Sequence, residues 1–182
     1  AKSGIEAYLA PSPDVVKRVR DSGRYELADR LSLIGTDVKI TVAYQDVPRG
    51  LGHAVACARQ AVGNEPFAVL LPDELMGDAS LLTQMCKMHD AVGKHVVGLK
   101  QVPMSDVSAY GCVTTTGAPD KQGVVTVTGV VEKPAIDEAP SDLILIGRYV
   151  LGADMFDMLD TLAPAKGGEI LLTDALLMAA TA

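Results

Sequence analysis

The stretch from Lys39 to Asp73 constrains the fold more than any other part of the chain. Residues Lys39–Tyr44 alternate polar side chains with β-branched and other apolar ones, which predicts a β-strand. A loop with Pro48 and two glycines follows, and Leu51–Val62 carries apolar residues at helical spacing. Phe67–Leu71 is a short apolar run, typical of a strand buried on both faces of a parallel sheet. This order of strand, loop, helix and strand predicts an α/β fold with an open sheet.

Candidate ligand-binding residues fall at one edge of that sheet. Asp73 and Glu74 directly follow the second strand, and ligands of open α/β sheets bind at the carboxyl ends of the strands. Gly50 and Gly52 lack a Cβ atom, so their backbone can approach an anion or a base closely. The amide of Gln45 can donate and accept hydrogen bonds, which suits the edge of a pyrimidine. We therefore predict a nucleotide site in which Asp73 is a ligand of Mg²⁺, a cation that prefers carboxylate and phosphate oxygens.

A second candidate group is Glu132-Lys133-Pro134, at the end of a predicted strand over residues 124–132. Glu132 can accept hydrogen bonds from sugar hydroxyls, and Lys133 can hold a phosphate as a point charge. Adjacent strand residues point to opposite faces, so the two side chains can act together only if the strand ends there, as Pro134 indicates. Each motif alone also has a plainer interpretation: GLG as a tight turn, Asp73 as a helix cap, and the Glu-Lys pair as a surface ion pair.

The combined motifs resemble those of bacterial UTP–glucose-1-phosphate uridylyltransferases. Q-x₄-G-L-G-H-A-V, an apolar strand and L-P-D stand together, and GLGHA is closer to the uridylyl branch than to the thymidylyl branch. Further matching segments occur in the order of the family: Ser3–Glu6, Ala109–Gly111, Val131–Pro134, Ile146–Leu151 and Glu169–Ala175.

This resemblance implies a Rossmann-like nucleotidyltransferase sheet, mostly parallel and mixed, with helices on both faces, in a single domain over residues 1–182. The implied reaction makes UDP-glucose and pyrophosphate from UTP and glucose 1-phosphate, with Mg²⁺ as cofactor. Lys133 and Asp73 are the implied catalytic residues. The implied substrate-binding residues are Gln45, Gly50, Gly52, Tyr110, Gly111, Glu132, Lys133 and Gly147.

Two segments of the family pattern are not found in this sequence. The N-terminal glycine-rich loop that grips the triphosphate is one, and the C-terminal part with a further aspartate is the other. We therefore expect the 182 residues to be incomplete at both ends and inactive alone. Two alternatives stay open: another sugar-1-phosphate nucleotidylyltransferase, such as a thymidylyltransferase, and a non-catalytic regulatory domain that binds nucleotide sugars.

Composition narrows the partners and the compartment. The net charge of −7 argues against a nucleic acid or an anionic membrane surface as partner. We expect neither a signal peptide nor a membrane span, since no apolar run approaches the ~18 residues of a span. Three widely spaced cysteines fit free thiols in a reducing cytoplasm.

A zinc site is not indicated. His53 and Cys57 have a spacing that zinc can use, but no second pair completes the four-ligand set. The resemblance further implies a homo-oligomer, dimer or tetramer, in carbohydrate metabolism and polysaccharide biosynthesis.

Further helices and strands are expected from the spacing of apolar residues and from the glycines and prolines that interrupt it. Residues 14–34 predict amphipathic helices, divided at Gly23, that pack over one edge of the sheet. A helix is expected over residues 1–9, and another over residues 80–92. Strands are expected over residues 95–102 and 144–151, and an amphipathic helix over residues 153–162. Thr173 and Asp174 are candidate caps of a final helix.

Overall fold

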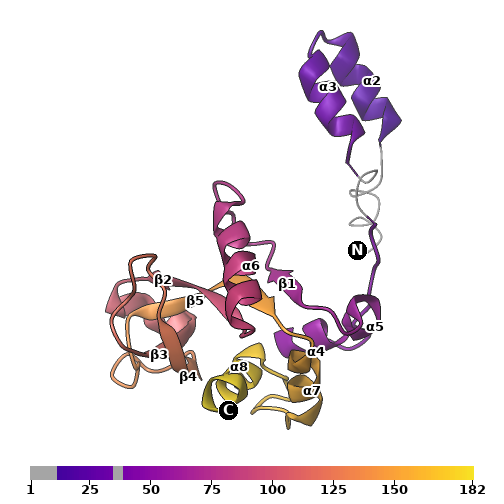
Figure 1. The fold of residues 1–182 in the computed structure, drawn as a ribbon. Coiled ribbons are helices and arrows are strands. Elements are labelled where there is room, and N and C mark those ends of the chain that lie inside the picture. Colours follow the sequence, from indigo (N-terminus) through magenta and orange to yellow (C-terminus); the bar gives the residue numbers. More distant parts are fainter. Residues whose placement is uncertain (1–11, 35–38) are drawn as a thin grey trace. The chain divides into compact units, whose positions relative to one another are not determined.

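The computed structural model describes residues 12–34 and 39–182 (Figure 1). Contacts divide the chain into two compact units, Ala1–Tyr44 and Gln45–Ala182. The helix expected over residues 1–9 lies outside the described residues. A single domain over residues 1–182 stays a prediction.

The first unit contains a pair of helices, α2 (Pro13–Asp21) and α3 (Tyr25–Ser32), which pack against each other. Pro13 at the first helical position has the backbone angle that a helix start requires. Gly23, with φ of +79°, forms the turn between the helices, where L-residues are strained. Two amphipathic helices divided at Gly23 are thus confirmed. Their packing over the sheet stays a prediction.

Residues 39–44 do not form the strand that their alternation predicts. Ile40, Val42 and Tyr44 are all more than two fifths exposed. A strand exists only where a neighbour accepts and donates its ladder of backbone hydrogen bonds, and no described strand pairs with this segment. Alternation of polar and apolar residues was therefore not enough to predict a strand at residues 39–44.

The second unit is built on a five-stranded sheet: β1 (Phe67–Leu70), β2 (Val96–Gln101), β3 (Gly111–Thr116), β4 (Thr126–Glu132) and β5 (Leu143–Leu151). Strand β5 pairs with β1, β2 and β3, and β4 pairs with β3. All these pairings are antiparallel. The α/β class is confirmed, but a mostly parallel sheet is wrong for the described strands. The reason is that β5 runs between β1 and β2 in the opposite direction and separates them.

Burial also differs between the strands. From Ile144 to Leu151 every residue of β5 is buried, so β5 is the strand with both faces covered. In β1 the residues alternate between half-buried and exposed, and Leu70 is 51% exposed. The prediction that Phe67–Leu71 is buried on both faces is therefore wrong, because β1 lies beside β5 rather than at the centre of the sheet.

The helices of this unit are α4 (Gly50–Ala56), α5 (Arg59–Val62), α6 (Ser80–Val92), the 3₁₀ helix η1 (Met104–Ala109), α7 (Asp154–Thr161) and α8 (Leu172–Thr181). Helices α4, α7 and α8 contact one another, α8 also contacts β4, and α6 contacts β2 and β5. The main core joins α4, α7 and α8 to one face of β5. A smaller cluster joins Val107 of η1 to Ile144 on the opposite face.

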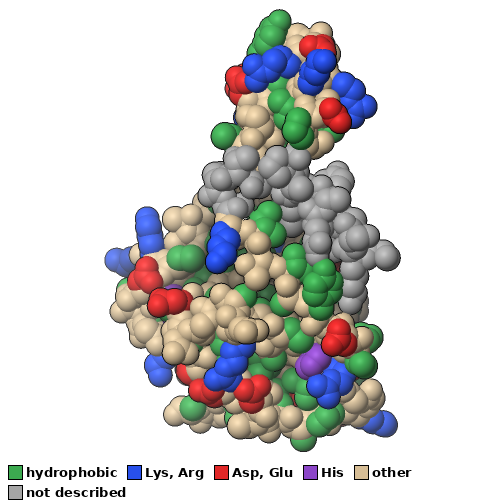
Figure 2. Space-filling model, turned by 90° about the vertical axis from the view of Figure 1, so that its right-hand side faces the viewer, with side chains coloured by type: hydrophobic (Ala, Val, Ile, Leu, Met, Phe, Trp, Pro, Cys, Tyr) green, Lys and Arg blue, Asp and Glu red, His purple; other side chains and the backbone are tan. Residues whose placement is uncertain are grey.

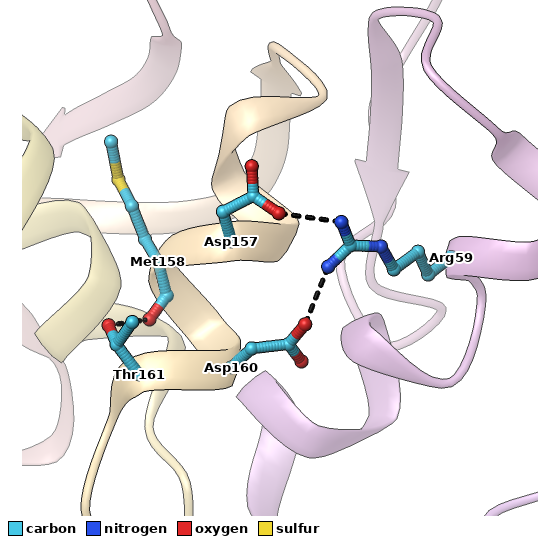
Figure 3. A network of polar contacts seen from close by, with 5 residues as sticks. All are labelled: Arg59, Asp157, Met158, Asp160 and Thr161. Carbon is cyan, nitrogen blue, oxygen red and sulfur yellow. Dashed lines mark hydrogen bonds and ion pairs between the residues drawn. The ribbon is translucent and has the colours of Figure 1, made fainter.

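Phe156 on α7 is central to the main core. It is 1% exposed, and its ring stacks on that of Phe67 in β1 with centroids 4.6 Å apart. Above this pair, Arg59 donates one hydrogen bond to Asp157 (2.6 Å) and one to Asp160 (2.5 Å), as Figure 3 shows. These contacts join α5 to α7.

The surface of both units carries mixed charge. In Figure 2 acidic and basic side chains are interspersed on the visible face rather than gathered by sign. Among the described helices, none is both long enough and apolar enough to cross a membrane.

Candidate active site

The glycine loop at the start of α4 packs on the segment before α8. The N–H of Gly52 donates to the carbonyl of Ile170 (2.9 Å), and the N–H of Ile170 donates to Arg49 (2.8 Å). A Cβ atom on Gly50, whose φ is +86°, would lie 2.7 Å from Ile170 O. The glycines therefore permit a close approach of two backbone segments. Their predicted contact with the base stays a prediction.

Gln45 is tied to the same loop. Its Nε2 donates to the carbonyl of Gly50 (3.2 Å) and lies 2.7 Å from Nδ1 of His53. A carbonyl oxygen only accepts hydrogen bonds, so this contact determines which way the amide points. His53 thus forms a local hydrogen bond, with a residue eight positions earlier in the chain. In the described ranges, no three His, Cys, Asp or Glu side chains lie close enough together to hold a metal ion.

Asp73 lies in the turn Leu71–Glu74 that follows β1. Leu71 N–H donates to the carbonyl of Gly147 in β5 (2.9 Å), and Glu74 N–H donates to the carbonyl of Leu71 (3.3 Å). A Cβ atom on Gly147 would lie only 2.6 Å from that of Leu71. Gly147 is therefore needed for this turn to approach β5. Its predicted contact with the sugar stays a prediction.

The Glu132-Lys133 pair lies at the end of β4. Among the described residues other than glycine, only Lys133 has a positive φ, of 45°, and its N–H donates to the carbonyl of Tyr110 (3.0 Å). Gly111 pairs with Glu132 in the sheet, and a Cβ atom there would lie 3.4 Å from Glu132 Oε2. The strand ends at Glu132, which is the condition under which both side chains can act together. A backbone held at a disfavoured angle often marks a functional position.

Tyr149 links this pair to the turn with Asp73. The side chain is buried, and burial, followed by the negative charges of Glu132 and Glu74, raises the pKa of its phenol to about 12. The contacts agree with this: the place of a Cβ atom on Gly147 lies 3.0 Å from Glu74 Cγ, and that on Gly111 lies 3.4 Å from Glu132 Oε2 and 3.2 Å from Leu145 in β5. Burial, with a smaller effect of Glu132, also raises the pKa of the neighbouring thiol of Cys112. The end of β4 and the Leu71–Glu74 turn thus converge on one part of β5.

Helix α8 and the segment just before it lie between the glycine loop and the strand pair that ends at Glu132. Ile170 contacts Gly50 and Gly52, and three residues further on the methyl group of Thr173 lies 3.0 Å from the place of a Cβ atom on Gly111. Thr173 Oγ1 is buried and has no hydrogen-bond partner in the part of the chain that the structure describes. The predicted caps are wrong: Leu171 is the cap residue, and no side chain caps this helix. Thr173 and Asp174 lie inside α8, so neither is in the cap position.

Asp73 fits a magnesium ion that is bound mainly by phosphates. Its side chain is exposed on the turn, and a carboxylate is a hard oxygen donor. Mg²⁺ in proteins commonly takes one or two carboxylates and completes its shell with water and phosphate oxygens. A single carboxylate is therefore an adequate donor set for a cation that arrives with a nucleotide.

Arg148 contacts the turn that contains Asp73, and the sequence did not single it out. It lies inside β5, is 8% exposed, and donates to the carbonyls of Leu71 (3.1 Å), Gly147 (2.7 Å) and Glu74. The available signal was a charged residue inside the apolar run Leu143–Leu151, since buried charges need specific partners.

The chain is similar in sequence and in fold to known nucleotidyl transferases. The nucleotidyl transferase family matches residues 12–182. The chain is 41% identical over 177 residues to the UTP–glucose-1-phosphate uridylyltransferase of Bacillus subtilis, covering 96% of this chain and 59% of that protein. A structure of UDP-glucose pyrophosphorylase complexed with UDP-glucose aligns with a TM-score of 0.85 at 31% identity, covering 98% of this chain and 65% of that one. A UTP-bound enzyme from Acinetobacter baumannii aligns with a TM-score of 0.80 at 33% identity, covering 96% and 61%. The chain thus spans about three fifths of the length of these curated relatives.

Proposed function

The chain belongs to the nucleotidyl transferase family, and we propose that the protein containing it transfers a uridylyl group from UTP to glucose 1-phosphate. A phosphate oxygen of glucose 1-phosphate attacks the α-phosphorus of UTP, the bond to the β-phosphate breaks, and pyrophosphate leaves. UDP-glucose is the other product. Such a reaction depends on positioning and on neutralisation of charge more than on proton transfer.

The observation that carries this proposal is that the Leu71–Glu74 turn and the end of β4 approach neighbouring residues of β5. The place of a Cβ atom on Gly147 lies 3.0 Å from Glu74 Cγ, and that on Gly111, which pairs with Glu132, lies 3.2 Å from Leu145. This arrangement supports one site in which the sugar phosphate, held at the end of β4, lies close to the turn that contains Asp73. In-line transfer requires the two phosphates to meet, so the residues that hold each of them must be close together. The names of the relatives support the choice of substrates.

Each residue has a proposed role that follows from its chemistry. Lys133 neutralises the phosphate of glucose 1-phosphate, and Glu132 accepts hydrogen bonds from the sugar. Gln45 and the backbone at Gly50 and Gly52 contact the uracil. The remaining sugar contacts come from Tyr110, Gly111 and Gly147.

Asp73 is the proposed ligand of Mg²⁺, which when bound neutralises charge on the phosphates. The exposed position of Asp73 on its turn supports this role. We further propose a cytoplasmic homo-oligomer, dimer or tetramer, whose UDP-glucose enters carbohydrate metabolism, including polysaccharide biosynthesis. A sedimentation experiment on the full-length protein tests the assembly state.

The reaction is tested on the full-length protein with UTP, glucose 1-phosphate and Mg²⁺. We expect pyrophosphate release and UDP-glucose in equal amounts. Faster turnover with dTTP than with UTP would instead support a thymidylyltransferase. Binding of UDP-glucose in calorimetry without any turnover would support a regulatory domain and contradict the proposed reaction.

A further inference from the structure

Arg148 is a buried cation without a carboxylate partner. It is 8% exposed, its neighbours Tyr149 and Val150 are buried, and no carboxylate of the described residues lies within ion-pair distance of it. A charged group in such a place is costly unless its hydrogen-bonding groups are satisfied. The position therefore requires an explanation beyond packing.

The hydrogen bonds that the guanidinium makes to described residues all go to backbone carbonyls. Nη1 donates to Leu71 O at 3.1 Å and to Gly147 O at 2.7 Å, and Nη2 donates to Glu74 O. Leu71 and Glu74 are the two ends of the turn that contains Asp73. One rigid, planar side chain thus holds both ends of the turn against β5.

Asp73 depends on this turn for its position. Its side chain is exposed, and it makes no hydrogen bond or ion pair within residues 39–182 as described. Its location is therefore determined by the backbone. The backbone is held by Arg148 and by the contact between Leu71 and Gly147.

We propose that Arg148 is a positioning residue, which holds the Leu71–Glu74 turn so that the Asp73 carboxylate reaches a divalent cation bound to the nucleotide phosphates. This inference rests on the proposed function, because that reaction places the cation at Asp73. Arg148 touches neither substrate nor cation. It acts through the turn, as the groups that orient metal ligands do in other metal sites.

The test compares Arg148→Lys and Arg148→Met with the full-length wild-type protein. Lysine keeps the charge but cannot reach three carbonyls, and methionine keeps only the aliphatic stem. Arg59→Lys is the matched control, since Arg59 also bridges two elements but lies on α5 against α7. The readouts are Mn²⁺ binding by electron paramagnetic resonance in the presence of UTP, UDP-glucose binding by calorimetry with chelator, and far-UV circular dichroism.

We expect both Arg148 variants to weaken Mn²⁺ binding by about tenfold or more, the range found for groups that orient metal ligands. Metal-free binding of UDP-glucose should be unchanged, and Arg59→Lys should change neither property. In the Asp73→Asn background, Arg148→Lys should have no further effect on Mn²⁺ binding, because the two residues act in series. A merely structural arginine would instead weaken both kinds of binding together.

Wild-type affinity for Mn²⁺ in Arg148→Lys would overturn the inference, and so would equal losses of Mn²⁺ and UDP-glucose binding. If Arg148→Met is unfolded, Arg148→Lys decides alone, and unfolding of both variants would assign Arg148 a structural role only. A wild-type protein that binds neither UTP nor UDP-glucose would refute the proposed function itself. A wild-type protein that binds both, with an Arg148→Lys variant of normal Mn²⁺ affinity, would refute only the role of Arg148.

Discussion

Lys133 Nζ lies 4.0 Å from Oε1 of Glu132, although the two residues are adjacent in the chain. Neighbours within a strand point to opposite faces. Here β4 ends at Glu132, and the positive φ of Lys133 turns its side chain back toward the carboxylate. The ammonium is well exposed, with 63% of its side chain accessible, and is therefore available to a ligand.

Replacing Lys133 by alanine should lower kcat/KM for glucose 1-phosphate by about 100-fold or more, since one charged contact to a reacting phosphate is lost. The thermal midpoint should hardly change, because the side chain is exposed. Steady-state kinetics of pyrophosphate release measure the first effect. Lys121→Ala, in the exposed turn between β3 and β4, is the control and should behave like wild type. Equal kinetics for the two variants would contradict a role for Lys133.

Replacing Gly52 by alanine should destabilise the full-length protein by about 1–3 kcal/mol, the usual cost of overpacking. The added methyl group would lie 2.8 Å from Ile170 O and 3.0 Å from a methyl of Leu159. Gly77→Ala is the matched control, since a Cβ atom there meets no atom within 4 Å. Urea denaturation gives both values. A Gly52→Ala protein as stable as Gly77→Ala would show that the loop adjusts freely.

Stability should fall at alkaline pH through Tyr149. The folded pKa is raised from 10.0 to about 12, so the folded state retains the phenol proton that the unfolded chain loses. The stabilisation is complete below about pH 10 and is lost as pH rises to about 12, with a total of about 2–3 kcal/mol. Urea denaturation over this range measures it. Tyr149→Phe should lack this component, and identical pH profiles for the two proteins would refute the prediction.

Replacing Arg59 by methionine should lower the thermal midpoint slightly, and added salt should reduce the difference. The two aspartates hold the pKa of Arg59 above its ordinary value, with the hydrogen bond to Asp157 as the largest cause. Exposed ion pairs contribute little and are screened by salt. Melting curves at low and high salt test this. A difference that grows with salt would indicate that the contact with the Phe156 ring dominates instead.

Local sequence signals predicted most elements of the second unit. The helix expected over residues 80–92 is confirmed at the same bounds, and the strand expected over residues 144–151 differs from β5 by one residue. These segments combine a clear period with breakers at their ends, such as Gly93 after α6. The order of motifs along the chain also indicated a nucleotidyl transferase, the family whose model matches residues 12–182.

The partners of each strand could not be predicted from these local signals. Residues 39–44 and 67–71 are both expected to form strands, but only the second segment does, because it pairs with β5 whereas no described strand pairs with residues 39–44. The direction of pairing was also missed, since a continuous apolar run reports that both faces of a strand are covered, and β5 is covered in this way although its neighbours are antiparallel.

The sequence by itself determined the residue chemistry: a glycine loop, a carboxylate after a strand, and a Glu-Lys pair before a proline. Only the tertiary structure decided that Arg148 holds both ends of the Asp73 turn and that this turn and the end of β4 approach neighbouring residues of β5. The physical reason is that chemical identity belongs to single residues, whereas proximity depends on which strands pair and which backbone carbonyls a buried guanidinium reaches.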